Sequence, residues 1–344
     1  MALTTTTSID LLLYGLLFVL FMAFFGIPSI EKYRKKETIV LSSEKMTNGI
    51  EAPAITFVPL DRNTGYGFKK KSNQTSSMMN RYTMTFLLDH CQEINQPDLE
   101  NCISNDSFAL TDFLKTASFK LAVSSFGKLN KSQWSEDILQ ASNGKMFTWN
   151  PQRAITRHWE DFIFLSVYRN LNYYIFIHDI DFYIISSSPR GVTKAYWEIN
   201  GETMQNHYKE IALVKHKRLN LERQPCEEDE DYRFLDCVKE SLAEQVGCRL
   251  PWEKATRPDR EVCTKREQFK QFEKKATIIT SEEINEVKRM TGCLAPCCYK
   301  EYMFLNNNPK ILNDGMVGFV PGDQIVIGLW AVSRNTEFRE EVSD

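Results

Sequence analysis

The pattern of hydrophobic and polar positions predicts one apolar helix at the start of the chain, followed by strands and then amphipathic helices. Residues 11–27 carry no charged side chain, and roughly 20 apolar residues suffice to cross a bilayer. We therefore expect a transmembrane helix over residues 11–30 after a short stub, residues 1–10. A cleaved signal peptide is the alternative. No Lys or Arg precedes the run and no small-x-small cleavage site follows it, which favours an anchor.

Strand patterns recur in four later segments of the chain. Residues 31–60 are rich in β-branched side chains, with Pro53 and Pro59 on either side of the second of two strands, and residues 173–187 and 207–219 form long β-type runs. Residues 322–342 carry apolar side chains at every second position through Ile325, Ile327, Leu329 and Ala331, and predict one long strand in a central position of a sheet.

Helix signals gather near the C-terminal end. Residues 232–246 place apolar side chains on one helical face and stop at Gly247. Thr264 with Glu267, and Thr280 with Glu283, have the spacing of capping boxes and predict two further helices, the second ending at Gly292.

Nine cysteines indicate an oxidising compartment. The sequence alone does not choose among the pairings of the six that thread the helices, but a helical hairpin brings distant ends together in nested order. It favours Cys226–Cys297, Cys237–Cys293 and Cys248–Cys263. Cys91 and Cys102 most simply bond to each other. A zinc or redox site at Cys293, Cys297 and Cys298 lacks a second ligand motif, and the role of Cys298 stays open.

Three N-glycosylation sequons agree with an extracellular location, namely Asn73, Asn105 and Asn130. A basic cluster at residues 32–36 conflicts with it, because such clusters usually face the cytoplasm. Since the cysteines and sequons agree with each other, we expect residues 31–344 to be extracellular and the chain to lie in the plasma membrane.

Composition excludes several other classes. The net charge of −3 gives no support for nucleic-acid binding, and the motifs of hydrolases, metalloproteases and phosphate-binding loops are absent. We expect no enzyme and no cofactor. We interpret His178, Asp179 and Asp181 as polar residues where a strand crosses the fold, and not as a pair of metal ligands. We interpret the acidic run 227–231 as solvent-exposed residues that lead into a helix, and not as a proton sensor.

The order of these parts resembles the degenerin/epithelial sodium channel family, which includes the acid-sensing channels. Cys293-Leu-Ala-Pro-Cys297 followed by Tyr299 is similar to the end of that family's cysteine-rich thumb, although Ser241 stands where a further cysteine is expected. Met146 also replaces an expected cysteine. Further matches are residues 52–57 (APAITF), 143–150 (NGKMFTWN), 175–179 (IFIHD) and 322–341.

The resemblance implies an α+β fold with one N-terminal transmembrane helix and a large disulfide-rich extracellular domain that has a central β-sheet and a helical thumb. The nested disulfides would be the ladder of that thumb. The implied parts are palm strands at 31–60, a glycosylated lobe at 61–143, palm and β-ball strands at 144–225, the thumb at 226–300 and a palm strand at 301–344.

The implied function is a subunit, or a truncated form, of a trimeric, ligand- or force-gated, amiloride-sensitive sodium channel. Its partners would be the lipid bilayer, other channel subunits and, with a complete pore, sodium ions. The family's second membrane helix and filter stretch are not found in this sequence, so we expect no sodium current from the chain alone. The alternative is a non-conducting, membrane-anchored extracellular binding or regulatory protein.

Overall fold

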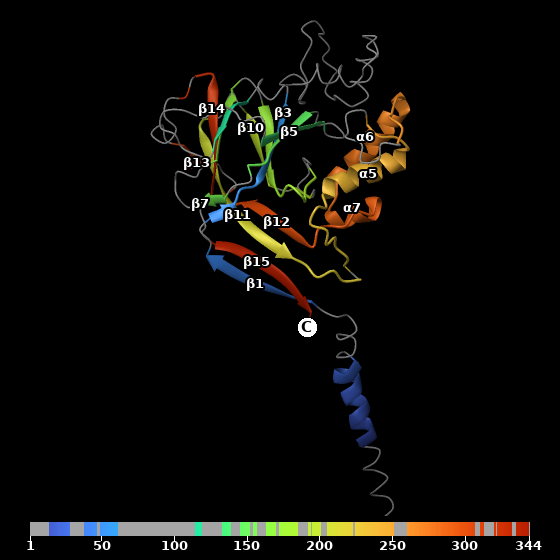
Figure 1. The fold of residues 1–344 in the computed structure, drawn as a ribbon. Helices are drawn as coiled ribbons and strands as arrows, with labels where there is room; N and C mark the ends of the chain where they lie inside the picture. The colour runs from blue at the N-terminus through green and yellow to red at the C-terminus, as the bar shows by residue number, and fades with distance from the viewer. Residues whose placement is uncertain are drawn as a thin grey trace, which may run out of the picture.

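The computed structural model shows an α+β chain in which two large sheets adjoin a group of helices (Figure 1). The structure describes residues 14–27, 38–46, 49–60, 114–118, 133–138, 145–151, 154–156, 163–169, 172–184, 192–193, 195–200, 205–222, 224–250, 260–306, 310–312, 320, 322–331 and 335–343.

An eight-stranded sheet forms the centre of the described fold. Its main path runs β1 (Thr38–Met46), β15 (Asn335–Ser343), β11 (His207–Lys217), β14 (Gln324–Ala331), β8 (Ile163–Tyr168) and β4 (Leu114–Ser118). Two further strands, β12 (Cys298–Phe304) and β13 (Lys310–Ile311), pair with β11 off this path. Strand β11 therefore contacts most of the sheet and connects its two ends.

A five-stranded sheet packs beside it in the order β10 (Tyr196–Asn200), β9 (Asn172–His178), β3 (Ala54–Leu60), β6 (Lys145–Trp149) and β5 (Trp134–Ile138). A two-stranded sheet joins β2 (Gly49–Glu51) to β7 (Ala154–Thr156). Side chains from both large sheets share one buried cluster that includes Phe57, Trp149, Leu165 and Ile327. Burial of these apolar surfaces is the main force that holds the sheets together.

The prediction of one strand over residues 322–342 is wrong. The segment forms two strands, β14 and β15, and both run parallel to β11. β14 lies along the first part of β11, beginning at His207, and β15 lies along its last part, ending at Lys217. Apolar alternation stops after Ala331, so the sequence does contain a trace of this division.

Strands β1 and β15 form an antiparallel ladder in which every residue of each strand has a partner, from Thr38 opposite Ser343 to Met46 opposite Asn335. Figure 1 shows the two strands side by side at the end of the sheet nearest to the N-terminal helical segment. β1 is thus the first described strand after that segment, and the last strand of the chain lies against it.

Three helices form what we call the helical module, Cys226–Cys297: α5 (Phe234–Val246), α6 (Arg266–Ser281) and α7 (Ile284–Thr291). α5 and α7 end at Gly247 (φ 82°) and Gly292 (φ 75°), where glycine adopts the left-handed conformation without strain. The capping-box expectations are wrong in detail. At α6 it is Gln268 whose side-chain oxygen accepts the N–H groups of Thr264 and Lys265, and α6 continues through the cap expected at Thr280.

Three disulfides close the helical module: Cys226–Cys297, Cys237–Cys293 and Cys248–Cys263. They are the nested pairs that the hairpin geometry favoured. Cys298 is exposed and carries a free thiol. Cys248, Cys263 and Cys293 pack with Phe234, Phe269 and other apolar side chains, so the disulfides are part of the module's core.

Residues 14–27 are helical and include a π-helical turn, Met22–Gly26. Their apolar side chains are exposed, among them Leu16, Phe18 and Phe24. Within the residues that the structure describes, no helix has both the length and the hydropathy needed to cross a bilayer. The remainder of the expected helix, up to residues 11 and 30, lies outside the described residues.

Candidate functional site

A cavity of about 240 Å³ lies where the helical module meets the two sheets. Its walls come from the end of β9, the residue after β11, the first turn of α7 and strand β12. Apolar and aromatic side chains such as Phe182, Ile284 and Tyr299 line it together with charged groups that include Arg218 and Lys300. A cavity with apolar walls and a few charged groups is the usual form of a small-molecule site.

One wall of the cavity is built on a buried hydrogen-bonded chain. The ring of His178 contacts the carbonyl oxygen of Asp179 through Nδ1 (2.9 Å) and Oγ1 of Thr56 through Nε2 (2.7 Å). A carbonyl oxygen only accepts, so Nδ1 carries the proton and Nε2 accepts from Thr56. Thr56 Oγ1 in turn accepts from the hydroxyl of Thr148 (2.8 Å). The ring also stacks on Tyr183, with centroids 4.0 Å apart.

These contacts suit a neutral imidazole. Burial lowers the pKa of His178 to about 4, which the hydrogen bond to Asp179 opposes only in part. His178, which the sequence predicted to be a polar residue in a strand, is therefore a buried core histidine whose two ring nitrogens are both hydrogen-bonded. Among the described residues, no group of three or more His, Cys, Asp or Glu side chains is placed to hold a metal ion.

Asp179, the next residue, ties this wall to β12. Its Oδ2 accepts the backbone N–H of Lys300 (2.8 Å). Burial raises the pKa of the Asp179 carboxyl, against the lowering effect of that hydrogen bond and of the Lys300 charge. The amine of Lys300 lies 2.7 Å from Oε2 of Glu51, whose Oε1 bonds to the amine of Lys215. Glu51 thus joins β2, β11 and β12.

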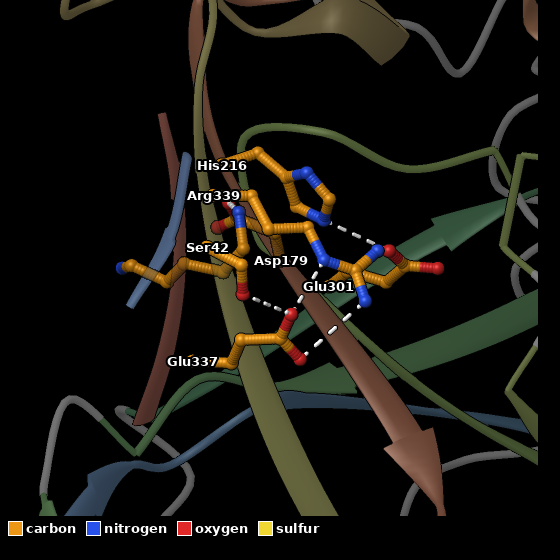
Figure 2. Close-up of polar contacts among 7 residues, drawn as sticks. Ser42, Asp179, His216, Glu301, Glu337 and Arg339 are labelled. Atoms are coloured by element: carbon orange, nitrogen blue, oxygen red, sulfur yellow. Dashed lines mark hydrogen bonds and ion pairs between the residues drawn. The ribbon is translucent and has the colours of Figure 1, made fainter. Parts of the chain in front are cut away.

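A row of polar side chains extends from the cavity towards the β1–β15 ladder (Figure 2). Nε2 of His216 lies 2.9 Å from Oε2 of Glu301 at the cavity rim. Glu337 on β15 accepts hydrogen bonds from Oγ of Ser42 (2.9 Å) and Nε of Arg339 (2.7 Å). The hydrogen bond from Arg339, followed by that from Ser42, holds the pKa of Glu337 below its usual range.

The charges of this row act on one another across the sheet. The hydrogen bond with Glu337 raises the pKa of Arg339, and the negative charge of Glu301 raises it further. β1, β15, β11 and β12 are therefore connected by polar side chains as well as by backbone pairing. A shift at the cavity rim would change the electrostatic surroundings of β15.

Arg218 provides a second connection from the cavity to β15. It follows β11, lines the cavity and has a half-buried side chain, 23% exposed. Its Nε lies 3.8 Å from Oε1 of Glu341, while Oε2 of Glu341 accepts the backbone N–H of Leu219 (3.2 Å). Tyr299 beside it is stacked on His216, with centroids 4.5 Å apart, and burial raises the pKa of its hydroxyl.

Sequence analysis did not identify this cavity. Its residues come from segments far apart in the chain, and no spacing in the sequence brings them together. Of the predicted site residues, the six cysteines of the helical module are described, whereas Cys91, Cys102, Asn73, Asn105 and Asn130 lie outside the described residues. The acidic run is exposed and bonds to its own backbone, since Glu227 accepts the N–H groups of Glu228 and Asp229.

Comparisons with known proteins give little sequence similarity. No family model matches the chain, and no curated protein matches it. Among solved structures, the chain is similar to a cryo-EM structure of a proton-activated chloride channel, with 8% identity and a TM-score of 0.30, over 98% of this chain and 86% of the other. At this identity and TM-score the match assigns neither a family nor a transported ion.

The comparison nevertheless corrects two predictions. Neither a family model nor a curated protein supports the degenerin/epithelial sodium channel family, and the similar solved structure is a chloride channel, not a sodium channel. The prediction of that family is wrong, and the amiloride-sensitive sodium transport deduced from it is wrong as well. The motifs behind it are short, and strands, disulfides and aromatic pairs of this kind recur in unrelated extracellular domains.

Proposed function

We propose that this chain is a membrane-anchored subunit of an oligomeric ion channel, and that its extracellular domain couples the cavity to the strands next to the membrane. The β1–β15 ladder carries the proposal. It pairs the strand that follows the apolar helical segment with the last strand of the chain, residue by residue. A displacement of β15 is therefore passed directly to β1 and to the segment that precedes it.

Two further observations support the membrane anchor and the extracellular location. Exposed Leu16, Phe18 and Phe24 form part of an apolar surface on residues 14–27 that is unfavourable in water and suited to lipid. Three disulfides in the helical module fit an oxidising compartment. The row from His216 and Glu301 to the ladder provides the route of coupling.

Whole-cell recording tests this function. The polypeptide should be expressed from its complete reading frame, and external chloride and external small cations should be replaced separately by impermeant ions. Because the similar solved structure is a chloride channel, chloride is the first ion to test. We expect a conductance that control cells lack and whose reversal potential follows one of the two ions.

The same cells provide the contrary outcome. A chain that is oligomeric at the surface, is labelled by an impermeant amine reagent and yet adds no conductance would contradict the channel proposal. It would favour the non-conducting, membrane-anchored binding protein.

A further inference from the structure

We infer that the cavity binds a small organic carboxylate with a compact apolar body, and that Arg218 receives the carboxylate. Binding of this ligand does not depend on the proposed function. The effect of binding on the channel does rest on it. The cavity volume, about 240 Å³, lies below the range of roughly 300–1,000 Å³ of sites for drug-sized ligands. The ligand is therefore small.

The charged groups around the cavity differ in how fully the protein already satisfies them. The amine of Lys300 contacts Glu51 at 2.7 Å, and the carboxylate of Glu301 contacts His216 at 2.9 Å. Asp179 accepts the backbone N–H of Lys300. Each of these groups has a close partner inside the protein and has little need of a ligand. The remaining carboxylate of the lining, Glu283, is exposed to water.

Arg218 is different. Among the described residues its guanidinium makes no hydrogen bond to a protein acceptor, and its nearest recorded carboxylate, Glu341, lies at 3.8 Å. A guanidinium offers five N–H donors in a planar fork that matches a carboxylate. The side chain is 23% exposed, so water satisfies these donors less fully than at the surface. A carboxylate from outside would complete them with charge-assisted hydrogen bonds.

The other walls define the rest of the ligand. Phe182 and Tyr299 meet edge to face, with centroids 4.8 Å apart, and Ile284 of α7 lines the same space. These side chains offer apolar surface to an aliphatic or aromatic body. A purely inorganic anion would leave that surface in contact with water, which is why an organic acid fits better.

Binding would also act on β15. A ligand carboxylate at Arg218 competes with Glu341 for the same guanidinium, and Glu341 lies opposite Val40 in the β1–β15 ladder. Occupancy therefore weakens one of the charge contacts that hold the end of β15 towards β11.

The test uses the full chain in detergent micelles or nanodiscs and three probes that share one body: 3-phenylpropionate, 3-phenylpropan-1-ol and 3-phenylpropylamine. Calorimetry and thermal shift should show binding of the carboxylate and a loss of about tenfold or more in affinity for the alcohol and the amine, the size of one charge-assisted contact. Equal binding of the alcohol or the amine would overturn the inference.

Variants separate the site from general effects. Arg218→Gln should weaken 3-phenylpropionate about tenfold, and Ile284→Trp should block the cavity. Lys217→Gln is the matched control, since it removes a neighbouring positive charge that pairs with Glu340 outside the cavity. Unchanged affinity in both Arg218→Gln and Ile284→Trp would place the ligand elsewhere. Conductance without carboxylate binding would refute this inference alone, and binding without conductance would refute only the proposed channel function.

Discussion

His178 and Thr56 meet through a buried hydrogen bond of 2.7 Å in which the hydroxyl of Thr56 donates to Nε2 of the ring. The direction is fixed because Nδ1 donates to the carbonyl of Asp179. A second proton on the ring would require the Thr56 hydroxyl to turn and accept from Nε2, which reverses the order of donors that runs from Thr148 through Thr56 to the ring. The neutral ring, which burial also favours, is therefore the form that these contacts suit best.

This contact predicts a loss of stability in mild acid. The pKa of His178 is lowered from 6.5 to about 4 by burial, so the unfolded chain takes up a proton at higher pH than the folded one. Folding stability should fall as the pH drops from about 6.5 towards 4, by roughly 3 kcal/mol in total. Chemical denaturation between pH 7 and pH 4 measures this slope. In His178→Gln the loss of folding stability between pH 7 and pH 4 should be smaller by about that amount. A variant that loses as much stability over this range as the parent would contradict the assignment.

Removing the innermost disulfide should destabilise the helical module measurably. Cys248 and Cys263 are separated by 15 residues, and in the chain-entropy model a loop of that size contributes about 3 kcal/mol. We expect the double variant Cys248→Ala with Cys263→Ala to lose about that free energy of unfolding, measured by denaturant titration. Cys298→Ala is the control, because Cys298 is free and exposed. Equal stability of the double variant and the control would be evidence against the predicted contribution.

Tyr232 should behave as a buried hydrogen-bond donor. Its hydroxyl donates to the carbonyl oxygen of Leu294 (2.8 Å), and burial, with the charge of Glu227, raises its pKa to about 12. Tyr232→Phe should cost about 1 kcal/mol of stability. Ultraviolet titration of the folded protein should lose one late-titrating tyrosine in the variant. The argument fails if the lost tyrosine titrates near its ordinary pKa of 10.

Locking the β1–β15 ladder should impair gating if the proposed function is right. Ser43 and Phe338 are register partners, and cross-strand Cα distances of about 4.5–5.5 Å are compatible with a disulfide. In the double variant Ser43→Cys with Phe338→Cys, oxidation to the disulfide should reduce the change in conductance that accompanies gating. Mild reduction of the disulfide should restore that change. The single variants are the controls. A fully cross-linked ladder with unchanged conductance would show that the two strands need not separate or slide.

Local features of the fold were predictable where the physical cause is local. The ends of α5 and α7 follow from Gly247 and Gly292, which adopt the left-handed conformation that stops a helix. The runs that became β3, β9 and β11 were visible from their side chains. The division of the last run into β14 and β15 was missed because it depends on which part of β11 each strand meets.

The cavity could not be predicted for the same reason. Arg218, Ile284 and Tyr299 come together only because the disulfides and strand β12 fold the helical module back onto the sheet. Short motifs were a poorer guide than periodicity, since they suggested a family that the comparisons do not support. The cap of one helix is determined by about four neighbouring residues, whereas membership of a family is determined by similarity over the whole chain.

The register of the β1–β15 ladder determines how it responds to force. Because Thr38 lies opposite Ser343, the ends of the two strands that lie nearest the N-terminal helical segment are direct partners. A pull that separates these ends laterally would open the ladder like a zipper, one pair at a time and at low force. A pull along both strands together would instead load all the hydrogen bonds between β15 and β11 in shear, from Val214 to Lys217, and meet far greater resistance. The same strands are therefore mechanically soft to lateral spreading and stiff to axial tension.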